Sequence, residues 1–340
     1  MQFGVTDHID LSGIPPAELL EERLRLVELY DQLGFDRYML TEHHGTPLCL
    51  VPSPHLFLAA ASQRTSRIRL GTLVTLLPLY NPLRLIEEVG VLDMLSGGRF
   101  ELGMGRGVSP PEIATYGIDP ADTPAMFDEA YEILIKGLGS ETVSHEGRFH
   151  SMNDVAMVVP PVQRPRPPLW YGVGSAERAA WAARNRINVM ALRPAKVVRP
   201  YMDAFLEAWD ETGRPVEERP LRGVDRPLVI AEDGAEARRI AAEAHAGFHH
   251  SLMLLWERTG TTPPTHFPPT FDLWQQAGGA FAGTPGEARE FIAEQIEVAG
   301  LDTMNFHLAF GNISFENVRR TAELFTSEVR PAFAEAGMRG

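Results

Sequence analysis

The stretch Ser96–Gly107, SGGRFELGMGRG, decides the fold class of this 340-residue chain. Its apolar residues alternate with other residues and predict a short strand, while the two glycines at its start are typical of the end of a helix. The glycines around Arg106 lack a Cβ, so the backbone can turn sharply there and a ligand can approach closely. The stretch therefore predicts a strand that presents a forked, permanent cation to a flat or anionic ligand.

A second polar cluster follows another apolar strand in the same way. Glu42, His43 and His44 come directly after the predicted strand Arg37–Thr41. In α/β barrels the residues that follow the strands gather at one rim, where the active site lies. The two clusters together predict a barrel enzyme with its chemistry at that rim.

The alternation of strand and helix patterns continues along the chain. The predicted strands are Phe3–Thr6, Arg37–Thr41, Ile68–Leu76, Arg99–Met104, Leu169–Val173, Asn188–Leu192, Pro227–Ala231 and Thr303–Ala309. Each is followed by a segment of helical periodicity, and eight such units are the number in a closed (β/α)8 TIM barrel. We therefore expect a single α/β domain over residues 1–340.

Two segments interrupt the alternation. Residues 143–168 are expected to form a β excursion before the fifth strand. Between about 247 and 283, prolines and aromatic residues replace the pattern, and we interpret this part as an insertion between units seven and eight. It is either a surface loop or an apolar lid over the rim, and we favour the lid because long irregular segments in compact domains are usually functional or disordered. Phe271 and Trp274 are its candidate substrate-pocket residues.

Composition excludes several classes of partner and site. A formal net charge of −14 argues against nucleic acids and anionic membrane surfaces, which are themselves anionic. Cys49 is the single cysteine, so an intramolecular disulfide and a multi-thiolate zinc site are impossible. The adjacent histidine pairs have the wrong spacing for a metal on regular structure, so no metal is expected. No leader or membrane-spanning segment is apparent, which favours a cytoplasmic protein.

The order and spacing of five motifs resemble the bacterial luciferase-like family of flavin-dependent monooxygenases. These motifs are Glu42–His44, Gly71–Pro78, Leu92–Gly107, Gly174–Ala176 and Gly283–Glu287. The resemblance runs nearly from end to end and is weakest in the insertion. It implies a TIM barrel that binds FMN across the carboxyl ends of its strands.

The resemblance implies that Arg106 binds the FMN phosphate, and a guanidinium does suit phosphate oxygens. Ser175 begins the helix after strand five, where free backbone N–H groups form an anion site. Arg178, one turn further on, matches a position that contacts the phosphate region in the family. The alternatives are an ordinary salt bridge for Arg106 and a plain helix cap for Ser175.

The same resemblance implies where the flavin ring lies. Leu73–Val74 matches the site where the family often has a non-proline cis peptide behind the ring. Gly105 stands where luciferase itself has a cysteine, and Gly174 stands where luciferase has a carboxylate. The departure at Gly105 argues against luminescence and leaves more room beside the ring.

His43 aligns with the catalytic histidine of the family, and an imidazole can give or take a proton near neutral pH. Glu42 could orient an imidazole or hold backbone N–H groups, and both uses stay open. His44 is a candidate for lining the substrate pocket. Arg193, after strand six, could recognise an anionic group of the substrate or lie on the plain surface.

The leading hypothesis is a monooxygenase in which reduced FMN, delivered by a separate flavin reductase, reacts with O2 to give a C4a-peroxide that oxidises a small, largely apolar organic substrate. An F420-dependent oxidoreductase of the same fold is the alternative enzyme, and a non-catalytic flavin-binding protein is the alternative of another class. The family also implies a homodimer, with contacts through the helices that follow strands two and three.

Overall fold

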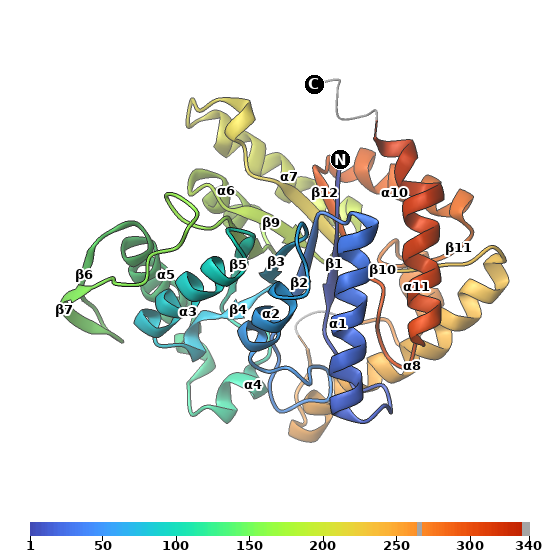
Figure 1. The fold of residues 1–340 in the computed structure, drawn as a ribbon, viewed down its shortest axis with the longest axis horizontal. Coiled ribbons are helices and arrows are strands. Elements are labelled where there is room, and N and C mark those ends of the chain that lie inside the picture. Colours follow the sequence, from blue (N-terminus) through green and yellow to red (C-terminus); the bar gives the residue numbers. More distant parts are fainter. Residues whose placement is uncertain (264–266, 335–340) are drawn as a thin grey trace.

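The computed structural model describes residues 1–263 and 267–334 and contains a closed barrel (Figure 1). Within these residues, eight parallel strands close the ring in chain order, because the seventh pairs with both the sixth and the eighth, and the eighth pairs with the first. They are β1 (Gln2–Asp7), β2 (Arg37–Leu40), β3 (Arg69–Thr72), β5 (Phe100–Gly105), β8 (Leu169–Gly172), β9 (Asn188–Ala191), β10 (Arg222–Ile230) and β12 (Thr303–His307). The predicted (β/α)8 TIM barrel is confirmed.

Helices follow the barrel strands and cover the outside of the ring (Figure 1). The longer helices are α1 (Pro16–Leu33), α2 (Pro54–Ser62), α3 (Pro82–Leu95), α5 (Thr123–Gly139), α6 (Ala176–Arg184), α7 (Ala195–Asp210), α8 (Gly234–Thr259), α10 (Pro285–Ala299) and α11 (Phe315–Leu324). Smaller elements are β4 (Thr75–Leu76), η1 (Leu77–Leu79), α4 (Pro110–Thr115), η2 (Pro120–Asp122), η3 (Val216–Glu218), α9 (Phe271–Gln276), β11 (Phe281–Gly283), η4 (Phe325–Val329) and η5 (Arg330–Phe333).

Local sequence explains where these helices begin. Asn81 caps α3 by accepting hydrogen bonds from the Leu83 and Arg84 backbone N–H groups, and Pro82 occupies the first helical position. At α10, Thr284 and Glu287 form a reciprocal capping box. None of the helices in the described ranges is both long enough and apolar enough to cross a bilayer.

A packed polar layer fills the amino end of the barrel interior. Trp170 donates its indole N–H to Glu101 Oε2 at 2.6 Å, and the guanidinium of Arg37 lies 4.8 Å from the Trp170 ring centroid. All three side chains are almost fully buried. The amino end of the barrel is therefore closed by packed side chains. The polar side chains that follow the strands lie at the carboxyl end.

The seventh strand begins earlier than predicted, and the predicted start at Pro227 is wrong. β10 starts at Arg222, and its first half closes the barrel by pairing with β9 and β12, whereas its last three residues pair with β11. Charged residues in this first half obscured the apolar pattern. They are buried because each has an internal partner: Arg222 pairs with Asp302 at 2.8 Å, for example.

The two segments that interrupt the strand–helix pattern contain secondary structure of their own. The β excursion predicted over 143–168 is confirmed as an antiparallel hairpin of β6 (Thr142–Glu146) and β7 (Ser151–Ala156), which projects beside α5 (Figure 1). The insertion starts later than predicted, because α8 continues to Thr259 and ends at Gly260 in a left-handed conformation. α9 and β11 lie further along it, and residues 264–266 lie outside the described residues. The role of this segment as a lid stays a prediction.

Candidate active site

Glu42 and His44 form a buried pair directly after β2. Glu42 Oε1 lies 2.8 Å from His44 Nε2, while its Oε2 accepts hydrogen bonds from the Leu76 backbone N–H at 3.0 Å and the Tyr80 hydroxyl at 3.2 Å. Glu42 therefore both orients an imidazole and holds a backbone N–H. The Tyr116 hydroxyl lies 2.8 Å from the other His44 ring nitrogen, so neither nitrogen is left for a substrate. That His44 lines a substrate pocket stays a prediction.

His43 has a carboxylate partner from another element. Its Nδ1 lies 3.0 Å from Glu112 Oε1, and Glu112 Oε2 accepts the His44 backbone N–H at 3.3 Å. Burial disfavours the imidazolium, but the adjacent Glu112 carboxylate outweighs it and raises the pKa of His43 above its usual range. Sequence reasoning missed Glu112, which lies on the short helix α4 after the Arg106 turn. The prolines before it, which are typical of a helix start, were the available signal.

A second histidine cluster lies beside His43 and was also missed. His8 follows β1 and His307 ends β12, and their Nδ1 atoms lie 3.1 Å apart. His307 Nε2 lies 3.0 Å from Oδ2 of Asp225, which comes from β10. The His8 ring stacks on both neighbours, with centroids 4.7 Å from His307 and 5.7 Å from His43. Three imidazoles from three strands therefore stand in a row at the carboxyl-end rim.

Two arginines and a helix start gather on another part of this rim. Arg106 is exposed after β5 and forms no ion pair with the residues that the structure describes. Ser175 caps α6 by accepting the Arg178 backbone N–H at 3.3 Å, and Arg178 pairs with Asp128 at 3.2 Å. Arg106 follows β5 and Arg178 follows β8, and these two strands pair with each other in the barrel. Burial raises the pKa of Tyr171 on β8, and Arg178 and Arg106 both oppose that rise. This is a suitable setting for a phosphate group.

The backbone beside these arginines has one open glycine, Gly174, and one covered glycine, Gly105. The Leu73–Val74 peptide is cis, as the family resemblance implies. Val74 packs so closely on Gly105 that a Cβ at Gly105 would overlap its side chain, whereas a Cβ at Gly174 would meet no other atom within 4 Å. The expectation that Gly105 leaves more room beside the ring is therefore wrong, because Val74 fills that space. With cations for a phosphate and the open surface of Gly174 next to them, the residues present fit FMN.

The insertion contacts the rim through aromatic side chains. Phe271 is buried and stacks on Phe310 with 6.1 Å between ring centroids, so it faces the protein interior. Trp274 is half-buried and stacks on Phe248 at 6.3 Å. Phe248 in turn lies edge-on to His8 at 5.4 Å. The insertion is thus linked to the histidine row, while the substrate-pocket roles of Phe271 and Trp274 stay predictions.

Arg193 follows β9 and is exposed. Its backbone carbonyl accepts a hydrogen bond from the buried Arg226 guanidinium at 2.8 Å, which fixes the loop that carries it. Its recognition of an anionic substrate group stays a prediction.

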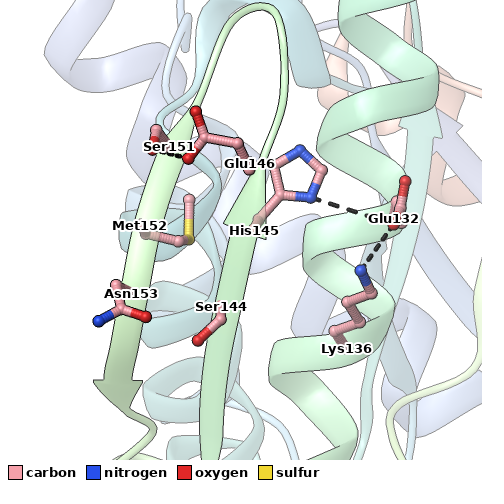
Figure 2. Close-up of a pocket in the computed structure, with 8 residues that line it drawn as sticks. All are labelled: Glu132, Lys136, Ser144, His145, Glu146, Ser151, Met152 and Asn153. Carbon is pink, nitrogen blue, oxygen red and sulfur yellow. Dashed lines mark hydrogen bonds and ion pairs between the residues drawn. The ribbon is translucent and has the colours of Figure 1, made fainter.

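A hollow of about 760 Å³ lies away from these clusters, between the β6–β7 hairpin and α5 (Figure 2). Its lining residues are Glu132, Lys136, Ser144, His145, Glu146, Ser151, Met152 and Asn153. Glu132 pairs with Lys136 at 2.6 Å and lies 4.0 Å from His145. These charges neutralise one another at the surface, so we assign no chemistry to the hollow. Across residues 1–263 and 267–334, no three His, Cys, Asp or Glu side chains are placed to hold a metal ion.

Comparison with known sequences identifies the family. Residues 1–303 match the family model of the luciferase-like monooxygenases. The chain is 36% identical to the uncharacterized protein y4wF of Sinorhizobium fredii over 97% of this chain and 96% of that protein. It is 37% identical to limonene 1,2-monooxygenase of Rhodococcus erythropolis over 83% and 73% of the two chains. The oxygenase component of the flavin-dependent trigonelline monooxygenase of Acinetobacter baylyi is 25% identical over 99% and 96%.

Solved structures agree with the sequence comparison. The monooxygenase RslO1 of Streptomyces bottropensis superimposes with a TM-score of 0.89 at 30% identity, over 98% of this chain and 100% of that one. Two more distant structures show the shared fold alone. One is the FMN complex of the oxygenating constituent of 3,6-diketocamphane monooxygenase of Pseudomonas putida, with a TM-score of 0.78 at 21% identity over 97% of this chain and 98% of that one. The other is the F420-dependent tetrahydromethanopterin reductase of Methanopyrus kandleri, with a TM-score of 0.73 at 20% identity over 98% of this chain and 99% of that one. The chain belongs to the luciferase-like monooxygenase family.

Proposed function

We propose that this protein is an FMN-dependent monooxygenase that uses reduced FMN and O2 to oxidise a small, largely apolar organic substrate. The observation that carries the proposal is the presence, at one barrel rim, of two clusters: Arg106 and Arg178 beside the start of α6, and His43 paired with Glu112 at 3.0 Å. The identity to limonene 1,2-monooxygenase, whose name gives an apolar substrate, supports the same reaction class.

The arginine cluster would hold the cofactor. Arg106 and Arg178 bind the FMN phosphate by charge-assisted hydrogen bonds, and the first N–H groups of α6 behind Ser175 add to the site. Gly174 leaves the surface beside it free for the ring, whereas the space beside Gly105 is taken by the Val74 side chain. Bound reduced FMN supplies the two electrons that O2 needs to give one oxygen atom to the substrate and release the other as water.

His43 would move protons during this reaction. If its Nδ1–H donates to Glu112 Oε1, then Nε2 is the nitrogen that gives or takes a proton on the substrate side. Glu112 stabilises the charged imidazolium, so His43 can hold a proton near neutral pH. Glu42 and His44 position this segment through their contacts with Leu76, Tyr80 and Tyr116.

Two partners belong to the proposal. A separate flavin reductase supplies the reduced FMN, which the printed name of the trigonelline relative, an oxygenase component, supports. A second copy of this chain forms a homodimer through α2 and α3. Exposed apolar side chains on these helices support this contact, with Leu56 74% exposed and Val91, Met94 and Leu95 each close to half exposed.

Turnover assays with each cofactor test the proposal. The wild type is incubated in air with FMN, NADH, a general flavin reductase and a panel containing a cyclic alkene, an aldehyde, a ketone and an amine. We expect an oxygenated product from at least one of them, and loss of that product in a folded His43→Ala variant. Anaerobic turnover with reduced F420 in place of FMN would replace the proposal by the F420 enzyme. Tight FMN binding without any product would favour a flavin-binding protein.

A further inference from the structure

The chain Asp225–His307–His8 is built like a proton relay that ends at the rim. Each neighbouring pair is within hydrogen-bond distance, 3.0 Å from Asp225 Oδ2 to His307 Nε2 and 3.1 Å between the two Nδ1 atoms. Asp225 and His307 are buried, whereas His8 is half-buried. The polar groups thus run from the barrel interior to a histidine with some access to solvent.

The buried end of this chain favours a positive charge. The second carboxylate oxygen of Asp225 is buried and has no hydrogen-bond partner within the described residues, so His307 is the group that hydrogen-bonds this carboxylate. The buried Arg226 guanidinium, next to Asp225 on β10, also offsets its charge. Burial disfavours the His307 imidazolium, but Asp225, with smaller contributions from Asp7 and Asp10, outweighs it and raises the pKa of His307. A proton can therefore reside on His307 near neutral pH.

The rim end of the chain favours a neutral ring. Burial lowers the pKa of His8, and the neighbouring His307 and His43 lower it further. The titratable groups that face His8 are His307 from β12 and His43 after β2, while α8 contributes the apolar ring of Phe248. His8 Nε2 forms no hydrogen bond with the described residues and is not one of the buried polar atoms without a partner. It is therefore free to meet a molecule at the rim.

We propose that His8 is a second acid–base residue of the reaction, distinct from His43, and that His307 and Asp225 are the positioning residues that store and supply its proton. The inference rests on the proposed monooxygenase function. His8 Nε2–H is donated to an oxygen of the reacting molecule while the His307 Nδ1–H moves to His8 Nδ1. One proton passes outward, His8 ends as the other neutral tautomer, and His307 keeps its Nε2–H on Asp225.

The relay is tested first in the cofactor-free protein by nuclear magnetic resonance of 15N-labelled histidine rings across the neutral pH range. The proposal expects one imidazolium that stays charged above the ordinary range for histidine and a neutral partner whose signals shift as it titrates. Asp225→Asn should move that titration to lower pH, and His8→Gln should remove the coupled signals. His250→Gln, an exposed change on α8, should leave both unchanged. Two histidines that titrate independently at ordinary values would overturn the relay.

Turnover of the FMN-loaded enzyme gives the second test. His8→Phe should lower kcat by about 100-fold, the range expected for loss of a general acid, with FMN affinity and KM within about twofold of wild type. Asp225→Asn should give a smaller loss of about tenfold and move the alkaline limb of the pH profile to lower pH. An unchanged kcat in a folded His8→Phe or His8→Gln variant would overturn the relay and leave the proposed function standing. If wild type gives no product, the proposed function fails, and the histidine titrations still decide whether the coupled pair exists.

Discussion

Glu112 sets the protonation behaviour of His43, although 69 positions separate the two residues. Replacing its carboxylate by an amide in Glu112→Gln keeps the shape but removes the negative charge that favours the imidazolium. The pKa of His43 should fall, so any activity that needs the charged form should be lost at a lower pH than in wild type. We expect the alkaline limb of kcat/KM to move down by about one pH unit.

Exposed Glu243→Gln on α8 is the matched control and should leave the profile unchanged. A limb that stays in place in Glu112→Gln would show that His43 is not the titrating group.

Asp10 makes a pH-dependent contribution to stability that can be measured without any ligand. Burial raises the pKa of Asp10 to about 7, although Arg23 and the Gly311 backbone N–H oppose the rise. Because the folded chain binds this proton more tightly than the unfolded chain does, stability through this group falls as pH rises from about 4 to about 7. Asp10→Asn mimics the protonated form, so its Tm relative to wild type should increase over that interval by a few degrees.

Exposed Asp272→Asn should show no such trend. A Tm difference between Asp10→Asn and wild type that stays constant or shrinks with rising pH would contradict this account.

Single residues were predictable where local sequence marks them. His43 and Arg106 each stand directly after an apolar strand, so their place at the rim follows from the barrel pattern alone. Glu112 lies in a segment without strong periodicity, and nothing local connects it to His43. His8 and His307 carry no motif of their own, and only closure of the ring places them 3.1 Å apart.

At the level of elements, the arginine cluster formed by Arg106 after β5 and Arg178 on α6 gives the clearest test. Arg106→Ala should weaken FMN binding by about 10- to 100-fold, the range expected for loss of charge-assisted hydrogen bonds to phosphate, and Arg106→Lys should recover part of it. Riboflavin, which lacks the phosphate, should bind wild type and Arg106→Ala about equally. Exposed Arg239→Ala on α8 serves as the control.

Equal losses for FMN and riboflavin in Arg106→Ala would indicate a damaged rim instead of a lost phosphate contact, and an unchanged FMN affinity would remove Arg106 from the site.

Elements with a clean apolar pattern were predicted well, and β10 shows why one was not. The first half of β10 carries Arg222, Asp225 and Arg226, which look like surface residues in the sequence. Each is buried because a distant residue neutralises or hydrogen-bonds it: Asp302, His307 and Gln295, respectively. A sequence pattern reports the polarity of each residue, and polarity does not indicate exposure where charged residues are buried together with a partner.

On the scale of the whole molecule, the number of strand–helix units predicted the closed barrel, because a TIM barrel consists of eight strands that are each followed by a helix. Closure makes the first and last strands neighbours, so β1 and β12 combine residues 299 positions apart at the rim. The sequence could therefore predict that the active site lies at the rim, but it could not predict which side chains contact each other there. A cytoplasmic location stays a prediction.

The proposed dimer is tested by changing its apolar surface. Leu56→Asp combined with Met94→Asp puts two charges on α2 and α3, and both side chains are exposed enough for the monomer fold to tolerate the change. Size-exclusion chromatography with light scattering should give a dimer for wild type and a monomer for the double variant. Val216→Asp, equally apolar and 59% exposed on η3, should remain dimeric. A monomeric wild type, or a double variant that stays dimeric, would contradict this contact.

The source of the transferred oxygen atom decides whether this protein is a monooxygenase. The reaction contains the FMN-loaded protein, a flavin reductase and the substrate found active in the panel, with 18O2 in ordinary water. The mass of the product is then measured by mass spectrometry. We expect one 18O atom in each product molecule, and we expect a folded His43→Ala variant to form the product far more slowly than wild type. Product that carries oxygen from water alone, or that forms equally well without O2, would contradict it.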